Sequence, residues 1–584
     1  MSNKSLLSTS IIEENIKKWK KFLQDQKLDA FYVSSFDIFL NEYVPLSDCH
    51  RYYVTGFSGS VAEVLMTVEG KVKLYVDGRY HEQADLEVDL NLVEVVKCSS
   101  DMSLGARLIL DLKKMSIKSL GYEADRTSLS YLKNLEEVTF TKGFFNQEIH
   151  QIIDFKTSNE LKQIEFVSRE HRGRDTLIKT KLILEDKSSA FYLTALDAIA
   201  WLTNCRGYQL PNLSSFKAKL LATRDQVWVF VPFGTPLSKA ALKEPGIHWI
   251  VDDFSKMPLQ LNKIQNELSL KQIFFDPQMI NAHDYKMLID IFGLDRLEEK
   301  KSGIIPVMSI KEPVEMDEMR RSFKKSDYAI TKTILWVKNS LKQKSQITEL
   351  DLYHQTDKYY GEVGSIEQSF KTIAGVGANA SIIHYSSPSD QVVIEPHHMV
   401  LLDSGGYYEG GFATDTTRTF LASFDGKPEK MAIEIYTLVL KGLLQAQNAV
   451  FPEGTKGNVI DGITRQPLFK AGYNYNHGTG HGVGIHVHED GVRLSPLSTL
   501  PMKPGQVVSI EPGIYLPGFG GVRLENIVHV INHPTLSGML CFEPLVYIGF
   551  DPKLIDFSML NSDELKWYHQ YEAICVERGT SLTF

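Results

Sequence analysis

The sequence predicts two successive α/β domains followed by an α+β domain. Three observations carry this prediction: the length of 584 residues, strand and helix patterns that alternate twice along the first half, and glycine-rich β runs between long helices in the second half. A chain of this length exceeds what one hydrophobic core usually organises, so several domains are expected. We place them at residues 1–150, 151–305 and 306–584.

The first two domains are recognised by amphipathic helices that alternate with short apolar strands. In the first domain these are residues 10–26 (helix), 30–35 and 72–78 (strands); in the second they are residues 159–184 (helix) and 190–207 (strand, then helix). Residues 30–33 with Asp37 resemble residues 190–193 with Asp197. This similarity indicates either an internal duplication or a chance match.

The third domain begins with a long helix after Pro313, because apolar residues recur at helical spacing from Met316 to Leu341. Thr348 and Asp351 form a candidate capping box for a second helix, and residues 428–447 predict another. Short β runs with many glycines lie between and after these helices. Nearly all candidate chemistry lies in this domain.

Composition excludes several classes of protein. Hydrophobic residues make up 43% and charged residues 23%, as in an ordinary globular protein, and a net charge of -9 gives no reason to expect nucleic acid or an anionic membrane as partner. The five cysteines are scattered without CxxC pairing, which suits a reducing compartment. The first residues lack the apolar core of a signal peptide, and no stretch approaches a membrane span. We expect a cytoplasmic location.

Four carboxylates in the third domain sit inside apolar, strand-like runs, where an unpaired charge costs several kcal/mol or more. Asp403 and Asp415 flank the tip of a predicted hairpin, Glu511 and Glu525 lie on two later strands, and His481 lies in a glycine-rich loop or strand. Each residue alone fits an ordinary turn or surface position. Together, four carboxylates and one imidazole could balance two divalent cations, and such an oxygen-rich set favours Mn²⁺, with Co²⁺, Fe²⁺ or Zn²⁺ as alternatives.

The motifs DSGGYYEGGFATDTTRT, HGTGHGVG, EPGIY and GVRLEN, in this order, resemble those of the pita-bread metallopeptidases, which include aminopeptidase P, prolidase and methionine aminopeptidase. The resemblance extends along the whole chain to the three-domain, eukaryotic-like form of aminopeptidase P. It is carried there by the runs around SDCHRYYVTGFSGS, LYVDGRY, TALDAIAWLTNCRG, SIIHYSS and FEPL. It implies two creatinase-like N-terminal domains, a pita-bread catalytic domain and usually a homodimer. It places Asp403, Asp415, His481, Glu511 and Glu525 on the five metal-ligand positions.

The resemblance also implies an activity: removal of the N-terminal residue from peptides with proline at the second position, through a hydroxide that bridges two divalent cations. Glu511 would also accept and pass on the proton, while His384, His477 and His488 would contact substrate or stabilise the tetrahedral intermediate. Arg523 would order nearby carboxylates or contact substrate, and a purely structural ion pair is the alternative. The proline preference itself follows only from the resemblance.

One departure from the family concerns the hairpin. Asp403 and Asp415 are 12 positions apart, one more than the family usually has, so the glycines at the tip must absorb a residue or one aspartate turns away from the metals. Two other functions remain open. One is prolidase activity, limited to Xaa-Pro dipeptides; the other is a metal-free peptide-binding or protein-binding module of the same fold.

Overall fold

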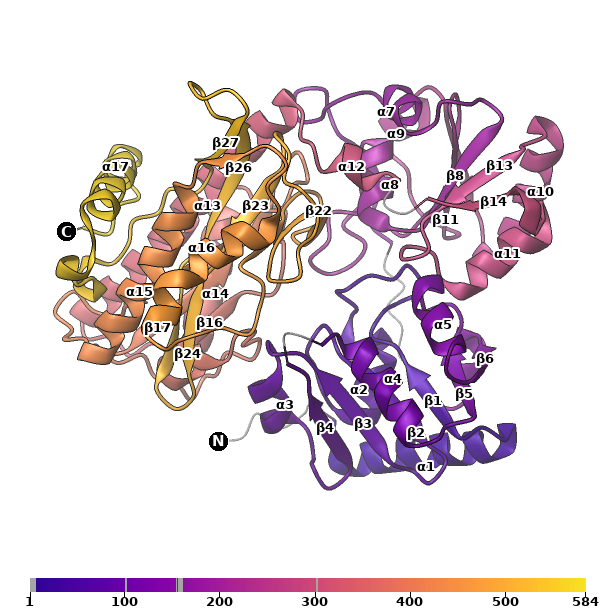
Figure 1. The fold of residues 1–584 in the computed structure, drawn as a ribbon, viewed down its shortest axis with the longest axis horizontal. Helices are drawn as coiled ribbons and strands as arrows, with labels where there is room; N and C mark the ends of the chain where they lie inside the picture. The colour runs from indigo at the N-terminus through magenta and orange to yellow at the C-terminus, as the bar shows by residue number, and fades with distance from the viewer. Residues whose placement is uncertain (1–6, 100–101, 154, 156–160, 301–302, 584) are drawn as a thin grey trace. The chain divides into compact units, whose positions relative to one another are not determined.

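The structure is a computed structural model that describes residues 7–99, 102–153, 155, 161–300 and 303–583. The chain divides into two compact units (Figure 1). One unit comprises Met1–Phe166 and Arg174–Val307, and the other comprises Val167–Gly173 and Met308–Phe584. The first unit therefore contains most of both predicted N-terminal domains, and the second contains the predicted catalytic domain.

The first unit begins with a mixed sheet of strand order β4-β3-β2-β1-β5-β6. Its strands are β1 (Ala30–Val33), β2 (Glu63–Thr67), β3 (Val72–Val76), β4 (Val93–Lys97), β5 (Ser119–Glu123) and β6 (Phe140–Phe144). Helix α1 (Thr9–Gln26) covers one face, where Trp19 packs on Phe31 with ring centroids 4.6 Å apart. Helix α4 (Leu104–Lys114) covers the other, where Leu108 packs with Tyr32 (Figure 1). Alternation along β1 thus supplies both layers of core.

A second mixed sheet in the same unit has the order β12-β11-β10-β8-β13-β14. Its strands are β8 (Ser189–Leu193), β10 (Lys219–Thr223), β11 (Val227–Val231), β12 (Ile247–Val251), β13 (Gln272–Phe275) and β14 (Leu297–Glu299), and its helices include α8 (Leu196–Thr203), α10 (Met257–Leu268) and α11 (Ala282–Phe292). The two similar sequence runs, on β1 and β8, occupy the same position in the two sheets. Ala30 pairs with Thr67 as Ala190 pairs with Thr223. The matching order and directions favour a duplication over chance.

The prediction of one helix over residues 159–184 is wrong for most of the residues that the structure describes in this range. Only α7 (Thr176–Ile183) is helical, while Glu165–Phe166 forms a short strand, β7, against β9 (Cys205–Arg206). Residues 159 and 160 lie outside the described residues. Gly173 interrupts the apolar pattern, and Asp175, in extended conformation, begins the real helix.

The predicted helices of the third domain are confirmed. They are α13 (Pro313–Lys342), α14 (Glu349–Glu362) and α15 (Lys430–Gln447), and the structure adds α16 (Gly457–Lys470) and α17 (Ser562–Arg578). The Thr348 side chain accepts a hydrogen bond from the Asp351 amide at 3.2 Å, and the Asp351 carboxylate accepts one from the Thr348 amide at 2.9 Å. This reciprocal pair is the predicted capping box.

Two sheets lie beside these helices in the second unit (Figure 1). One has the order β16-β17-β19, and the other β20-β27-β26-β23-β21-β22. The strands are β16 (Ile373–Val376), β17 (Met399–Ser404), β19 (Thr416–Leu421), β20 (Phe451–Pro452), β21 (Gly480–Gly482), β22 (Glu489–Leu494), β23 (Val507–Ile510), β26 (Asn526–Asn532) and β27 (Met539–Pro544), with a separate ribbon of β24 (Gly513–Leu516) and β25 (Gly520–Arg523) and a short pair of β15 (Glu367–Gln368) and β18 (Gly406–Tyr407). The predicted α+β arrangement is confirmed.

Two expectations from composition have structural counterparts. The cysteines are free thiols, of which Cys49, Cys98, Cys205 and Cys575 are buried and Cys541 is half-buried. Across the part of the chain that the structure describes, none of the helices combines the length and apolar character needed to span a bilayer.

Candidate metal centre

The hairpin of β17 and β19 places Asp403 and Asp415 on one face. Asp403 pairs directly with Thr417, so their side chains point the same way. Asp415 stands two residues before Thr417 and therefore shares that face. Both carboxylates are buried, with 8% and 5% of their residues' surface exposed.

The extra residue between the two aspartates is absorbed at the hairpin tip. An isolated bridge between Tyr407 and Ala413 continues the register of β17 and β19 without a shift. Beyond it the chain turns through Gly411, which has a φ of +66° and donates its amide to the Tyr408 carbonyl at 2.8 Å. A left-handed glycine permits this turn, so neither aspartate is displaced to the other face.

Glu511 and Glu525 face each other across a second ribbon. Ile510 at the end of β23 pairs with Asn526 at the start of β26, and Gly513 on β24 pairs with Arg523 on β25. The same register on both sides sets Glu511 opposite Glu525. The Glu525 amide also donates to the Thr417 carbonyl at 3.1 Å, which ties this ribbon to the aspartate hairpin.

His481 on β21 completes the cluster. Its Nε2 lies 3.5 Å from Asp415 Oδ2 and 3.4 Å from Glu511 Oε1. Gly480 makes this approach possible, because a Cβ there would lie 1.8 Å from the Ser509 carbonyl oxygen on β23. Ligand atoms of Asp415, His481 and Glu525 all lie within 4.8 Å of one another.

The negative charge of the buried carboxylates favours the binding of cations. Burial raises the pKa of both Asp415 and Glu525 well above the usual range. The neighbouring carboxylates of Asp403 and Glu511 raise both pKa values further, and Glu525 also raises the pKa of Asp415. Arg523 opposes the shift but supplies a single positive charge. The Oδ1 atom of Asp403 is buried with no hydrogen-bond partner among the described residues. A buried acceptor without a partner, beside carboxylates that repel one another, fits a pair of divalent cations.

Arg523 connects the carboxylates to a predicted histidine through Tyr515. Its guanidinium donates to Asp403 Oδ2 at 2.6 Å and to the Tyr515 hydroxyl at 2.9 Å. The same hydroxyl lies 2.9 Å from Nε2 of His477. The sequence analysis gave Tyr515 no role. The alternation of the ribbon could have identified it, because Tyr515 is two residues after Gly513, the partner of Arg523, and so shares the face of Arg523.

The other two predicted histidines lie at different distances from the cluster. The ring of His488 meets that of His481 edge to face, with centroids 4.4 Å apart. His384 lies in a half-buried turn next to Ile383, whose carbonyl accepts a hydrogen bond from Arg523 at 3.3 Å.

Arg418 was also missed by the sequence analysis. It is fully buried and donates to the carbonyl of Glu525 at 2.5 Å and to the side chain of Asn526 at 2.7 Å. Arg418 therefore fixes the backbone that carries Glu525. Its place in the ATDTTRT run gave no sign of this role, because Glu525 and Asn526 are more than 100 positions away.

Comparison with known proteins places the chain in a family. Residues 317–532 match the model of metallopeptidase family M24, and residues 15–149 and 157–315 each match a creatinase/prolidase N-terminal domain. The "Probable Xaa-Pro aminopeptidase P" of Botryotinia fuckeliana is 31% identical over 96% of this chain and 88% of its own length. The chain belongs to the aminopeptidase P family. A relative of the same name from Pyricularia oryzae is 29% identical over 98% of this chain.

Solved structures agree on the fold of this family member. The X-prolyl aminopeptidase of Caenorhabditis elegans, described as a cytosolic enzyme with a di-nuclear active site, aligns with a TM-score of 0.87 at 24% identity over 97% of this chain and 96% of its own. An Xaa-Pro dipeptidase from Bacillus anthracis aligns over 64% of this chain with a TM-score of 0.53. The predicted fold, two creatinase-like domains followed by a pita-bread domain, is confirmed.

Proposed function

We propose that this chain is a metal-dependent aminopeptidase that hydrolyses the N-terminal Xaa-Pro bond of peptides. Two divalent cations would be held by Asp403, Asp415, His481, Glu511 and Glu525. The observation that carries the proposal is the convergence of four carboxylates from two separate β ribbons on one centre with His481, whose Nε2 lies 3.4 Å from Glu511 and 3.5 Å from Asp415. The names of the family's members supply the reaction and the substrate class.

Two divalent ions at this position would supply a water of lowered pKa and polarise the scissile carbonyl. The chain's own groups handle the proton. The Glu511 carboxylate is partly held by the Ser509 hydroxyl at 3.3 Å, and its amide donates to the Thr479 carbonyl at 2.8 Å. This fixed carboxylate is suited to accept a proton from the attacking water and pass it to the leaving proline nitrogen.

Three histidines are proposed to act on the substrate: His384, His477 and His488. The ring of His477 is oriented by the Tyr515 hydroxyl, and the ring of His488 packs on His481. The Gly478 carbonyl, 2.7 Å from Nδ1, and the Tyr515 hydroxyl occupy both nitrogens of His477, so this ring is suited to contact the substrate through its face. A ring N–H of His384 or His488 can donate to the substrate carbonyl as negative charge develops on its oxygen. Arg523 acts through Asp403, which it orients.

The donor set favours Mn²⁺, because four carboxylates and one imidazole are harder ligands than zinc usually selects; Co²⁺, Fe²⁺ and Zn²⁺ also fit. The substrate is a peptide with proline second, whose Xaa-Pro bond has no amide hydrogen. A cytoplasmic location and a homodimer complete the proposal. The relative from C. elegans, which is described as cytosolic, supports the first of these two points.

The experiment compares metal content and peptide cleavage in one preparation. Purified full-length protein is analysed for bound metal, stripped with chelator, and assayed on Xaa-Pro-Xaa and Xaa-Pro peptides before and after Mn²⁺ is added. Glu511→Gln should abolish cleavage. Glu409→Gln, at an exposed carboxylate that pairs with Lys325 in the same unit, should leave it intact.

Each outcome separates the candidate functions. Cleavage of Xaa-Pro-Xaa that requires metal supports the aminopeptidase. Cleavage of Xaa-Pro dipeptides alone would make the chain a prolidase. Absence of both bound metal and cleavage would leave only a peptide-binding or protein-binding module.

A further inference from the structure

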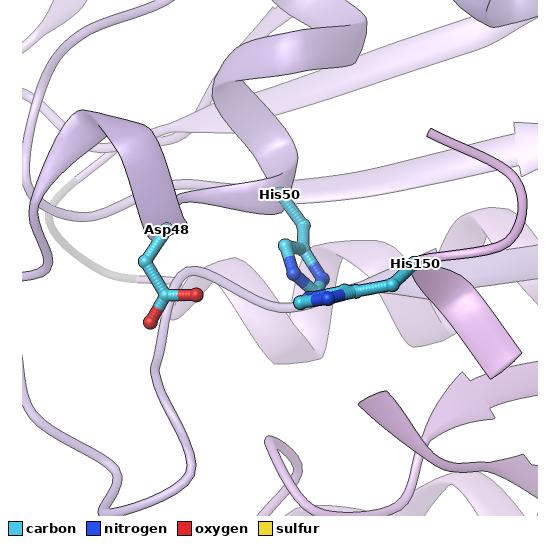
Figure 2. Close-up of side chains that lie close together, drawn as sticks. All are labelled: Asp48, His50 and His150. Atoms are coloured by element: carbon cyan, nitrogen blue, oxygen red, sulfur yellow. The ribbon is translucent and has the colours of Figure 1, made fainter. Parts of the chain in front are cut away.

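A second group of metal-ligating side chains lies in the first unit. Asp48 ends a short 3-10 helix, η1 (Leu46–Asp48), His50 begins α2 (His50–Thr55), and His150 follows α6 (Asn146–Ile149). One ligand atom from each residue lies within 4.8 Å of the others. Figure 2 shows the two rings close together, with the carboxylate of Asp48 turned toward them. The mechanism proposed above uses none of these three residues.

His50 is prepared as a ligand by the carboxylate behind it. Its Nδ1 shares a hydrogen bond with Oε1 of Glu123, and the other oxygen of Glu123 accepts the Ser34 amide at 2.9 Å. The Nε2 atom of His50 is buried and has no hydrogen-bond partner among the described residues, and the side chain is 0% exposed. Burial lowers the pKa of His50 well below its ordinary value, so the ring is neutral. Carboxylate–histidine pairs of this kind orient imidazoles toward metal ions.

His150 presents a second nitrogen in the same condition. Its Nε2 is buried and without a partner in the described chain, and its ring lies 5.4 Å from that of His50. Phe155 stacks on His50 with ring centroids 3.9 Å apart and contacts His150 at 5.0 Å, so the two histidines share one aromatic neighbour. Each of these buried nitrogens without a partner carries an energetic cost. A shared cation would remove both costs.

Acidic side chains outnumber basic ones around the rings. Arg126 is buried, and the carboxylates of Asp48, Glu123 and Asp125 act on it. Three carboxyl groups and one guanidinium therefore lie around the two imidazoles. Arg126 donates to Asp48 Oδ1 at 2.7 Å and to the Asp48 carbonyl at 2.8 Å, so its positive charge is directed at these acceptors.

We propose that His50, His150 and Asp48 bind one Zn²⁺ ion in the first domain, as a site additional to the carboxylate cluster of the third domain. Two imidazoles and one carboxylate are a common zinc donor set, with a fourth position for water. Tetrahedral zinc places its ligand atoms about 3.3 Å apart, so side chains whose ligand atoms lie within 4.8 Å of one another must close by up to about 1.5 Å. The half-buried positions of Asp48 and His150 leave room for that adjustment. The ion would link the η1–α2 segment to the end of α6.

The test counts zinc in full-length protein. The background is Asp415→Asn with Glu525→Gln, which removes two carboxylates of the third-domain cluster and so separates this proposal from the proposed activity. His150→Gln is added to that background, with His283→Gln as the matched control. His283 is another half-buried histidine of the same unit, whose ring packs on Phe145.

The proposal predicts that His150→Gln loses one zinc per chain relative to the background, while His283→Gln loses none. Zinc should raise the melting temperature of the background protein but not that of the His150→Gln protein. A crystal grown with zinc should show an anomalous peak between the two rings. Equal zinc content with and without His150, or no zinc bound by the background protein, overturns the proposal.

Discussion

Tyr515→Phe removes one oxygen atom that joins two parts of the candidate centre. The hydroxyl accepts a hydrogen bond from Arg523 at 2.9 Å and lies 2.9 Å from Nε2 of His477, which leaves it free to donate to that ring. The half-buried ring keeps its packing in the variant, because Phe keeps the apolar part of the side chain. The pKa of Tyr515, raised to about 12 mainly by burial, keeps the hydroxyl protonated at neutral pH. The substitution therefore isolates the two hydrogen bonds.

The size of the effect follows from what each partner loses. A hydrogen bond to a charged group contributes about 1.5–3 kcal/mol, and Arg523 Nη1 would be left with the more distant Ile383 carbonyl at 3.3 Å. The His477 ring would lose the contact that orients its Nε2. If about 1.5–3 kcal/mol of transition-state stabilisation is lost, kcat/KM falls roughly 10- to 150-fold. The fall should lie mainly in kcat, because the two hydrogen bonds hold His477 and Arg523 in the geometry that the reacting groups need.

The assay is cleavage of an Xaa-Pro-Xaa peptide by metal-loaded protein, with metal content measured in the same samples. Tyr473→Phe is the matched control, since the hydroxyl of Tyr473 makes an exposed contact with the Met431 sulfur at 3.4 Å. Retained metal with lowered kcat in Tyr515→Phe alone would support the reasoning. Unchanged kcat/KM in this variant would refute the role given to the Arg523–Tyr515–His477 chain.

Three further predictions concern the second unit. Asp415→Asn should reduce cleavage by more than about 100-fold. Without metal, however, the variant should melt at a higher temperature than the wild type, because one of four mutually repelling carboxylates is gone. Calorimetry after chelation measures both melting temperatures, and a lower value for the variant would contradict this reasoning. Gly480→Ala should lower the free energy of unfolding by about 1–3 kcal/mol, since the added Cβ would lie 1.8 Å from the Ser509 carbonyl oxygen. Urea unfolding measures this, and an unchanged midpoint would show that β21 need not approach β23 so closely. Burial raises the pKa of Asp327 from 3.8 to about 7. Between these two pH values the folded state holds a proton that the unfolded state has released. The free energy of unfolding therefore falls as pH rises, by up to about 1.4 kcal/mol per pH unit. Asp327→Asn should flatten that slope while the side chain still accepts the Tyr547 amide, and equal slopes in both proteins would exclude Asp327 as the cause.

The sequence was sufficient to predict most individual elements, for reasons that are local. Helix α13 follows from apolar residues at helical spacing, and the start of α14 follows from the reciprocal bonds of Thr348 and Asp351. The prediction of a helix over residues 159–184 was wrong, because an apolar pattern alone does not distinguish a helix from a strand or loop in its polar segments.

By itself, the sequence determined which chemical groups are available: four carboxylates in apolar β runs, one histidine among glycines, and an order of motifs typical of one family. Tertiary structure alone decided which groups meet. The common register places Glu511 opposite Glu525, Arg418 holds the Glu525 backbone from more than 100 positions away, and His150 meets Asp48 and His50 across about 100 positions of one domain. Such contacts depend on strand pairing and burial between distant segments, and no local pattern of residues encodes those distances.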